Sequence, residues 1–172
     1  MKQVLSILVQ NQPGVLVRVA SMFSRRGFNI DSLTVGITQN PEVSRMTVVI
    51  FGNEAIMNQV VKQLAKLVEV LAVQILPTDE SVTRGMALVK VNTGNRRTEV
   101  LKLAEVFRAN VVDLKEETLT LEITGDENKI LAFADVLKPY GILEMIRTGL
   151  VGLERGTNIM YKWDDKSEQN VL

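Results

Sequence analysis

Residues 4–30, VLSILVQNQPGVLVRVASMFSRRGFNI, decide the fold of this chain. Val4–Val9 is rich in apolar and β-branched residues, which predicts a strand. The run Asn11–Gly14 (NQPG) breaks that strand, and a helical pattern follows it. The expected apolar face of this helix is Leu16, Val19, Ala20 and Phe23. A second strand is expected from Ile30 onward, so the stretch is a strand, a tight turn, a helix and the start of another strand.

The same kind of pattern continues along the chain and then repeats. After the strand at 30–37 we expect strands at 45–51 and 68–76, and between them a helix capped by Gly52-Asn53 with Ile56, Val60, Leu64 and Leu67 on one face. The second copy is expected as a strand at 86–91, a helix opened by Asn95, a hairpin of 111–115 with 119–123, a helix capped by Asp126 and a strand at 142–151. The order β-α-β-β-α-β is that of the ferredoxin-like arrangement. The sequence therefore predicts an α+β fold of two tandem ferredoxin-like units, with antiparallel sheets and helices on one face.

These patterns also predict the domain boundaries. The first domain is expected at residues 1–76, a polar linker at 77–85, the second domain at 86–160 and a polar tail at 161–172. The first strand is apolar on both faces, whereas the helices cover only one face of its sheet. We therefore expect something to cover the other face, and predict a dimer or a larger assembly.

Composition excludes several kinds of chemistry. The 172 residues contain no Cys and no His, which removes disulfides, thiolate nucleophiles, His-based acid–base catalysis and the usual zinc ligands. The 20 basic and 20 acidic residues balance, which argues against a nucleic-acid footprint. No window is apolar enough for a membrane span, and the amino terminus does not have the pattern of a signal peptide. Composition leaves open catalysis by Asp, Glu, Lys, Ser or Arg and an all-oxygen metal site. We nevertheless expect a cytoplasmic protein that binds neither nucleic acid nor membrane and has no catalytic residue and no metal site.

One loop has the composition of a small-molecule site. Gly14 lets a ligand approach the backbone closely, and the free N–H groups of the following helical turn favour a carboxylate. The neutral polar side chains are expected to hold an ammonium group, and the apolar ones an aliphatic side chain. The residues of this expected effector site are Asn11, Gly14, Val15, Leu16, Asn29 and Ile30.

On the residues alone, other interpretations stay open. The loop is also a common helix-capping turn. An RNA-recognition module has the same element order, but it needs stacking aromatics on its first and third strands, where this chain has only Phe51. An acylphosphatase-type enzyme would use an Arg and an Asn, for which Arg18 and Asn29 are available, although Arg18 falls inside the expected helix. A metal chaperone of this fold would need paired cysteines.

Longer stretches carry a resemblance to a known family. VQNQPGVLVRVASMFSRRGFNIDSLTVG, at residues 9–36, resembles the amino-terminal signature of acetolactate synthase small subunits, whose first unit is an ACT domain. The second half resembles the same family in GMALVKV, EVFRANVVD, LTLEITG and IRTGLVGLERG. The resemblance covers nearly the whole chain.

The resemblance implies a regulatory subunit that binds no substrate. Such subunits associate with a large catalytic subunit, activate it and confer feedback inhibition by a branched-chain amino acid, usually valine. The effector would lie between two ACT domains of a homodimer. The loop of one copy, with Asn11, Gly14, Val15 and Leu16, would face Asn29 and Ile30 of the other. The thiamine diphosphate, FAD and magnesium of the reaction would belong to the large subunit, and this chain would carry no cofactor.

The sequence leaves several points open. It does not distinguish valine from leucine or isoleucine as effector, nor does it show which surface meets the catalytic subunit. In the second unit Asn92–Asn95 occupies the matching place without the Pro-Gly pair, so effector binding there is undecided. A free-standing ACT-domain sensor of some other enzyme stays the alternative function.

Overall fold

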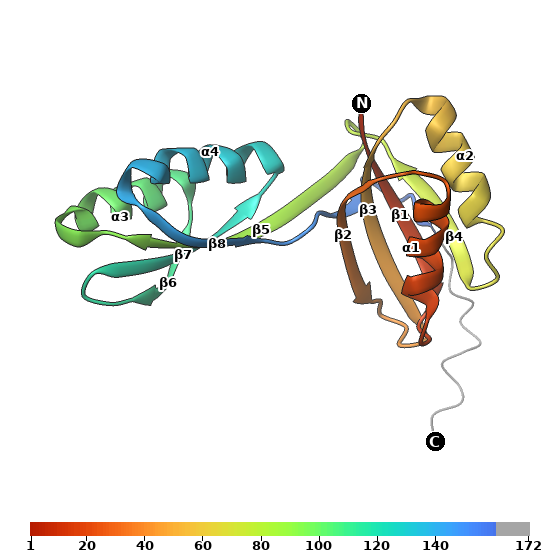
Figure 1. Cartoon of the computed structure of the whole chain (residues 1–172), viewed down its shortest axis with the longest axis horizontal. Helices are drawn as coiled ribbons and strands as arrows, with labels where there is room; N and C mark the ends of the chain where they lie inside the picture. The colour runs from red at the N-terminus through yellow and green to blue at the C-terminus, as the bar shows by residue number, and fades with distance from the viewer. Residues whose placement is uncertain (161–172) are drawn as a thin grey trace, which may run out of the picture. The chain divides into compact units, whose positions relative to one another are not determined.

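The computed structural model describes residues 1–160, which form two compact units (Figure 1). The first unit holds Met1–Asp31, Val35–Val82 and the described residues from Leu153 on, and the second holds Ser32–Thr34 and Thr83–Gly152. The domain boundaries expected from sequence stay predictions, and the expected tail at 161–172 lies outside the described residues.

The first unit has the element order expected from the sequence. Its elements are β1 (Lys2–Gln10), α1 (Val15–Arg25), β2 (Ile30–Ile37), β3 (Val43–Phe51), α2 (Glu54–Leu64) and β4 (Val70–Leu76). The strands form one sheet in the order β2-β3-β1-β4, and β1 runs antiparallel to both β3 and β4. This is the ferredoxin-like arrangement, so the predicted fold class is confirmed for this unit.

The helices of the first unit bury faces that differ in part from those predicted. The buried residues of α1 are Val15, Val19, Met22 and Phe23, whereas Leu16 is 42% exposed, so the prediction was wrong at Leu16. Spacing alone did not fix the rotation of the helix, and starting the pattern at Leu16 instead of Val15 moved the expected face. In α2 the buried residues are Met57, Val60 and Leu64, so the expected face was wrong at Ile56, which is only partly buried, and at Leu67, which lies beyond the end of the helix.

The central strand β1 is buried on both of its faces. Leu5, Ser6, Ile7, Leu8 and Val9 are each no more than 1% exposed. Side chains of successive strand residues point to opposite faces, so both faces of the sheet are covered at its centre. The apolar residues on both faces of this strand are therefore buried, as the sequence pattern indicates.

The second unit repeats the plan. It comprises β5 (Ser81–Asn92), a 3₁₀ turn (Gly94–Arg96), α3 (Arg97–Phe107), β6 (Asn110–Leu114), β7 (Thr118–Gly125), α4 (Glu127–Leu137), a 3₁₀ turn (Lys138–Tyr140), β8 (Ile142–Arg147) and β9 (Val151–Glu154). The sheet order is β6-β7-β5-β8, and β9 also pairs with β5. The orders of the two sheets match strand for strand, which confirms a tandem repeat of one fold.

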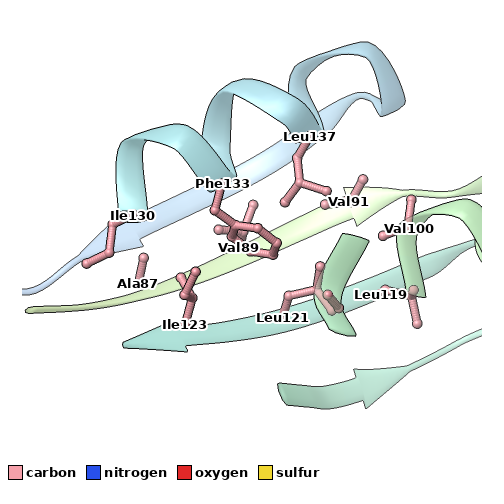
Figure 2. Packing of buried hydrophobic residues seen from close by; sticks show 11 residues of the cluster. Ala87, Val89, Val91, Val100, Leu119, Leu121, Ile123, Ile130, Phe133 and Leu137 are labelled. Carbon is pink, nitrogen blue, oxygen red and sulfur yellow. The ribbon is translucent and has the colours of Figure 1, made fainter. Parts of the chain in front are cut away.

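The core of the second unit forms between its sheet and its helices. Figure 2 shows Ile130, Phe133 and Leu137 of α4 pointing at the strands. Phe133 is fully buried, and its ring lies 5.2 Å from that of Phe107 on α3, at a tilt of 48°. Asp126 caps α4 as predicted, because its side chain accepts a hydrogen bond from the Lys129 amide.

Two strands of the second unit differ from the prediction. β5 begins at Ser81 and not at Met86, so part of the expected linker is strand. The polar composition of residues 81–85 does not indicate a strand. The expected strand 142–151 is interrupted after Arg147. The Thr148 side-chain oxygen accepts a hydrogen bond from the Met86 amide at 2.9 Å, where a ladder would use a backbone carbonyl. The chain resumes as β9 only at Val151.

Replacing Phe133 by Ala should destabilise the second unit by about 3–5 kcal/mol, because the change leaves a cavity where a fully buried ring contacts the sheet. Denaturant unfolding followed by circular dichroism measures this. The matched control is Val106→Ala on α3, where the side chain is exposed and the expected change is within about 0.5 kcal/mol. Equal effects of the two substitutions would contradict the described core.

Candidate functional site

The loop between β1 and α1 leaves the start of the helix open. Gly14 is the N-cap residue, with φ +85°, and makes no side-chain cap. A Cβ built on Gly14 would meet no atom within 4 Å, so the space beside it is empty. Among residues 1–160 no hydrogen bond engages the backbone amides of Leu16 and Val17. Two free amides at the positive end of an 11-residue helix form a site suited to a carboxylate.

Exposed aliphatic side chains lie at the same end of the unit as this opening. Leu16 and Val17 of α1 are 42% and 65% exposed, and Val35 and Ile37 of β2 are 42% and 65% exposed. Both pairs lie at the same end of the unit, because Gln10 pairs with Val43 and the Thr38 amide donates to the Val43 carbonyl. We call these four residues the aliphatic rim. Only Leu16 was among the predicted site residues; the exposure of the other three depends on tertiary packing and has no sequence signal.

Asn11 has a structural role in addition to the ligand-binding role expected from the sequence. Its side-chain Nδ2 donates to the Pro41 carbonyl at 2.8 Å, and its Oδ1 accepts from the Ser44 hydroxyl at 3.1 Å. Its backbone amide donates to the Glu42 carbonyl at 2.7 Å. Asn11 therefore fastens the β1–α1 loop to the β2–β3 turn. Its oxygen keeps one lone pair for an ammonium group, whereas its amide N–H groups have only one donor position left.

The structure does not bring all six predicted site residues together within one chain. Gly14, Val15 and Leu16 lie at the beginning of α1, with Val15 itself buried beneath the opening. Asn29, which is exposed, and Ile30, which is partly buried, follow the other end of that helix. Eleven residues of α-helix span about 16 Å. The two groups could share one small ligand only if they came from different copies of the chain.

The groups needed for an acylphosphatase-type site are not assembled. The Arg18 guanidinium forms an ion pair with Glu69, whose backbone carbonyl accepts from the Gln10 amide. Asn29 lies at the opposite end of α1. Within residues 1–160 no three His, Cys, Asp or Glu side chains are placed to hold a metal ion. No helix of that same part of the chain has both the length and the hydropathy to cross a membrane.

The matching loop of the second unit is fastened by its own side chains. Thr93 is buried, and both its amide and its hydroxyl donate to the Glu117 carbonyl. The Arg97 guanidinium donates to the carbonyls of Lys115, at 2.8 Å, and Glu116. The chain between Thr93 and Arg97 is a 3₁₀ turn that leads directly into α3, whose N-cap residue Arg96, like Gly14 at α1, makes no side-chain cap.

A second arginine of this loop is fastened too. Arg96 donates to the Pro139 carbonyl at 2.5 Å, and its guanidinium lies 4.4 Å from the centre of the Tyr140 ring. The Tyr140 hydroxyl donates to Glu99, and this hydrogen bond raises the pKa of the tyrosine. These contacts hold the second loop against the neighbouring turns.

Comparison with known proteins fixes the family. A family model described as the small subunit of acetolactate synthase matches residues 84–156, and a model of the AHAS small subunit-like ACT domain matches residues 5–72. The chain belongs to the acetolactate synthase small-subunit family. The resemblance seen in the sequence is thereby confirmed, and the first unit is an ACT domain.

Individual relatives of this family agree. A probable acetolactate synthase small subunit of Archaeoglobus fulgidus is 46% identical over 157 residues, which are 91% of this chain and 98% of that protein. The acetolactate synthase small subunit of Aquifex aeolicus is 43% identical over 171 residues, 98% of this chain and 86% of that protein. The crystal structure of the acetolactate synthase small subunit from Thermotoga maritima superposes with a TM-score of 0.87 at 38% identity, covering 92% of this chain and 99% of that one.

Replacing Gly14 by Ala should destabilise the ACT domain by about 1–2 kcal/mol, because a residue with a Cβ is strained at φ +85° even where space is free. Gly36→Ala is the matched control: it also has no atom within 4 Å of a Cβ, but its φ lies outside the left-handed region. Thermal unfolding of the two variants measures the difference. A Gly14→Ala variant as stable as Gly36→Ala would show that the helix start is not held in this conformation.

Proposed function

We propose that this acetolactate synthase small subunit is a non-catalytic regulatory subunit that binds a branched-chain amino acid, valine in the first place. It associates with the catalytic large subunit, activates it and subjects it to feedback inhibition. The observation that carries this proposal is the open start of α1 at Gly14, where two free backbone amides stand beside the aliphatic rim. The amides suit a carboxylate and the rim suits methyl groups, which together describe an aliphatic amino acid.

The effector site in this proposal is shared between two copies. Asn11, Gly14, Val15 and Leu16 come from one ACT domain, and Asn29 and Ile30 from its partner. The length of α1 supports this division, because it keeps the two groups about 16 Å apart within one chain. The exposed apolar residues of β2, an edge strand, supply a surface that a second copy would cover.

Regulation in this proposal is thermodynamic linkage. Valine must bind one arrangement of the ACT dimer more tightly than another, and the large subunit must favour the opposite arrangement. A coupling free energy of about 1–3 kcal/mol is enough, and it acts in both directions. The thiamine diphosphate, FAD and magnesium of the reaction belong to the large subunit in this scheme, and the small subunit supplies no catalytic group.

Isothermal titration of the purified chain with valine, leucine and isoleucine should show saturable uptake, and Gly14→Asp should abolish it. Asp puts a negative charge where the effector carboxylate binds. Gly94→Asp is the matched control, because it adds the same charge at another positive-φ glycine with free space beside it, in the loop of the second unit. Binding that survives Gly14→Asp, with valine still inhibiting the reconstituted enzyme, would contradict the site; no uptake of any aliphatic amino acid would contradict the function.

A second test addresses the dimer. Ile37→Lys should shift the sedimentation coefficient toward that of a monomer, because it places a charge in the rim of the shared site. Val68→Lys serves as the control: Val68 is even more exposed but lies in the turn between α2 and β4, away from the rim. If neither substitution changes the oligomeric state, the rim is not a contact between copies.

A further inference from the structure

The helix layer of the ACT domain carries unpaired charges of one sign. Residues 15–26 and 54–66 comprise α1, α2 and the residues that end them, and Glu54 is their single carboxylate. Arg18 forms an ion pair with Glu69. The remaining cations are exposed, and within residues 1–160 none of them pairs with a carboxylate. We call these four cations the basic patch: Arg25, Arg26, Lys62 and Lys66.

A side-chain contact brings the basic patch together. Arg25 and Arg26 lie at the end of α1. Lys62 lies in the last turn of α2, and Lys66 lies in the turn that follows this helix. The Arg26 guanidinium donates a hydrogen bond to the Gln63 side-chain oxygen at 2.9 Å, which joins the two helix ends. The four positive charges therefore gather at one place on the helix layer.

The second unit shows the same layer without such a patch. Its helices α3 and α4 hold the corresponding places in the repeated fold, and there the two signs of charge are mixed, which is typical of helices that face water. Lys138, for example, forms an ion pair with Asp135 at 2.6 Å. A helix dipole favours cations at the carboxy-terminal end of any helix, so the dipole does not explain why carboxylates are lacking in the first unit. The charged residues of 97–108 and 127–138 are Arg97, Glu99, Lys102, Glu105, Arg108, Glu127, Lys129, Asp135 and Lys138.

An unpaired patch of one sign suits a partner surface of the opposite sign. Like charges on one face repel each other, and an acidic surface removes that repulsion and guides the encounter of the two proteins. A nucleic acid fits less well, because the one aromatic residue of α1 and α2, Phe23, is only 1% exposed and offers no ring on which a base could stack. Acidic and basic residues also balance over the whole chain. The chemistry favours an acidic protein surface.

We propose that the basic patch is the surface of this chain on which an acidic face of the catalytic large subunit docks. The partner comes from the proposed function, on which this docking therefore rests, and the patch supplies the place. α1 reaches from Gly14, beside the proposed effector carboxylate, to Arg25 and Arg26, about 16 Å away. Effector and large subunit therefore act on opposite ends of one helix, and a displacement of α1 couples the two binding equilibria.

A charge-reversed variant of the full chain tests this docking. It combines Arg25→Glu, Lys62→Glu and Lys66→Glu and keeps the Arg26–Gln63 hydrogen bond. Its association with the purified large subunit, measured by isothermal titration, should be weaker by about tenfold or more. High salt should weaken the association of the wild type as well, because it screens exposed charges. The matched control makes the same change of charge at three exposed cations of the second unit and should associate like the wild type; it combines Arg84→Glu, Lys102→Glu and Lys115→Glu.

A neutral variant keeps the test decisive if charge reversal disturbs the ACT domain. Arg25→Gln with Lys62→Gln and Lys66→Gln should weaken the association less than the reversal does and should make it less dependent on salt. Circular dichroism and valine uptake of the isolated variants should match those of the wild type, because the basic patch is separate from the start of α1.

The outcomes separate this docking from the proposed function. Unchanged association of the reversed variant, with the large subunit still inhibited by valine, overturns the docking alone, whereas a wild type that never associates overturns the proposed function too. Equal losses in the patch and control variants would assign the effect to net charge. Altered valine uptake or an altered sedimentation coefficient of the isolated variant would assign the cations to the effector site or to a second copy. Uptake of a DNA duplex that only the patch reversal abolishes, with large-subunit binding unchanged, would assign them to nucleic acid; each of these results overturns the docking.

Discussion

The left-handed backbone of Gly14 is the constraint on which the proposed function of this chain depends. At α2 and α4 the side chains of Asn53 and Asp126 accept hydrogen bonds from helix amides and so satisfy them. At α1 a glycine stands in that position, and no side chain accepts from the first turn. The helix start therefore keeps its amides and its positive dipole end available to a ligand. An ordinary cap would stabilise the helix and occupy the amides of the proposed site.

The two units show how one fold diverges at a single loop. The sheets have the same strand order, and both first loops are fastened to the neighbouring hairpin turn. In the ACT domain Asn11 makes that contact from the start of the loop, which leaves the helix start free. In the second unit Thr93 and Arg97 make it from both ends of the turn. This difference is the structural reason why effector binding is proposed for the first unit and not for the second.

Much of the fold could be predicted from the sequence, because hydrophobic period and local capping are local properties. The repeated element order and the cap at Asp126 follow from such signals and are confirmed. The interruption after Arg147 could not be predicted, because it depends on a contact between Thr148 and Met86, 62 positions apart. The same holds for Asn11, whose partners are 30 and 33 positions away. The turn at Gly14 was visible in the sequence, whereas the exposure of Val17, Val35 and Ile37 around it required the packed unit.

The interleaving of the two units along the chain has a consequence for biosynthesis. The first unit includes the described residues from Leu153 on, although its sheet is complete at Leu76. A ribosome adds about 5–20 residues per second, so the last part of the ACT domain emerges about 4 to 15 seconds after its fourth strand. During this time the second unit is translated, and the nascent ACT domain still lacks its residues from Leu153 on. Assembly of the finished domain therefore requires translation beyond Leu153, and chains that end before this residue lack its last contacts.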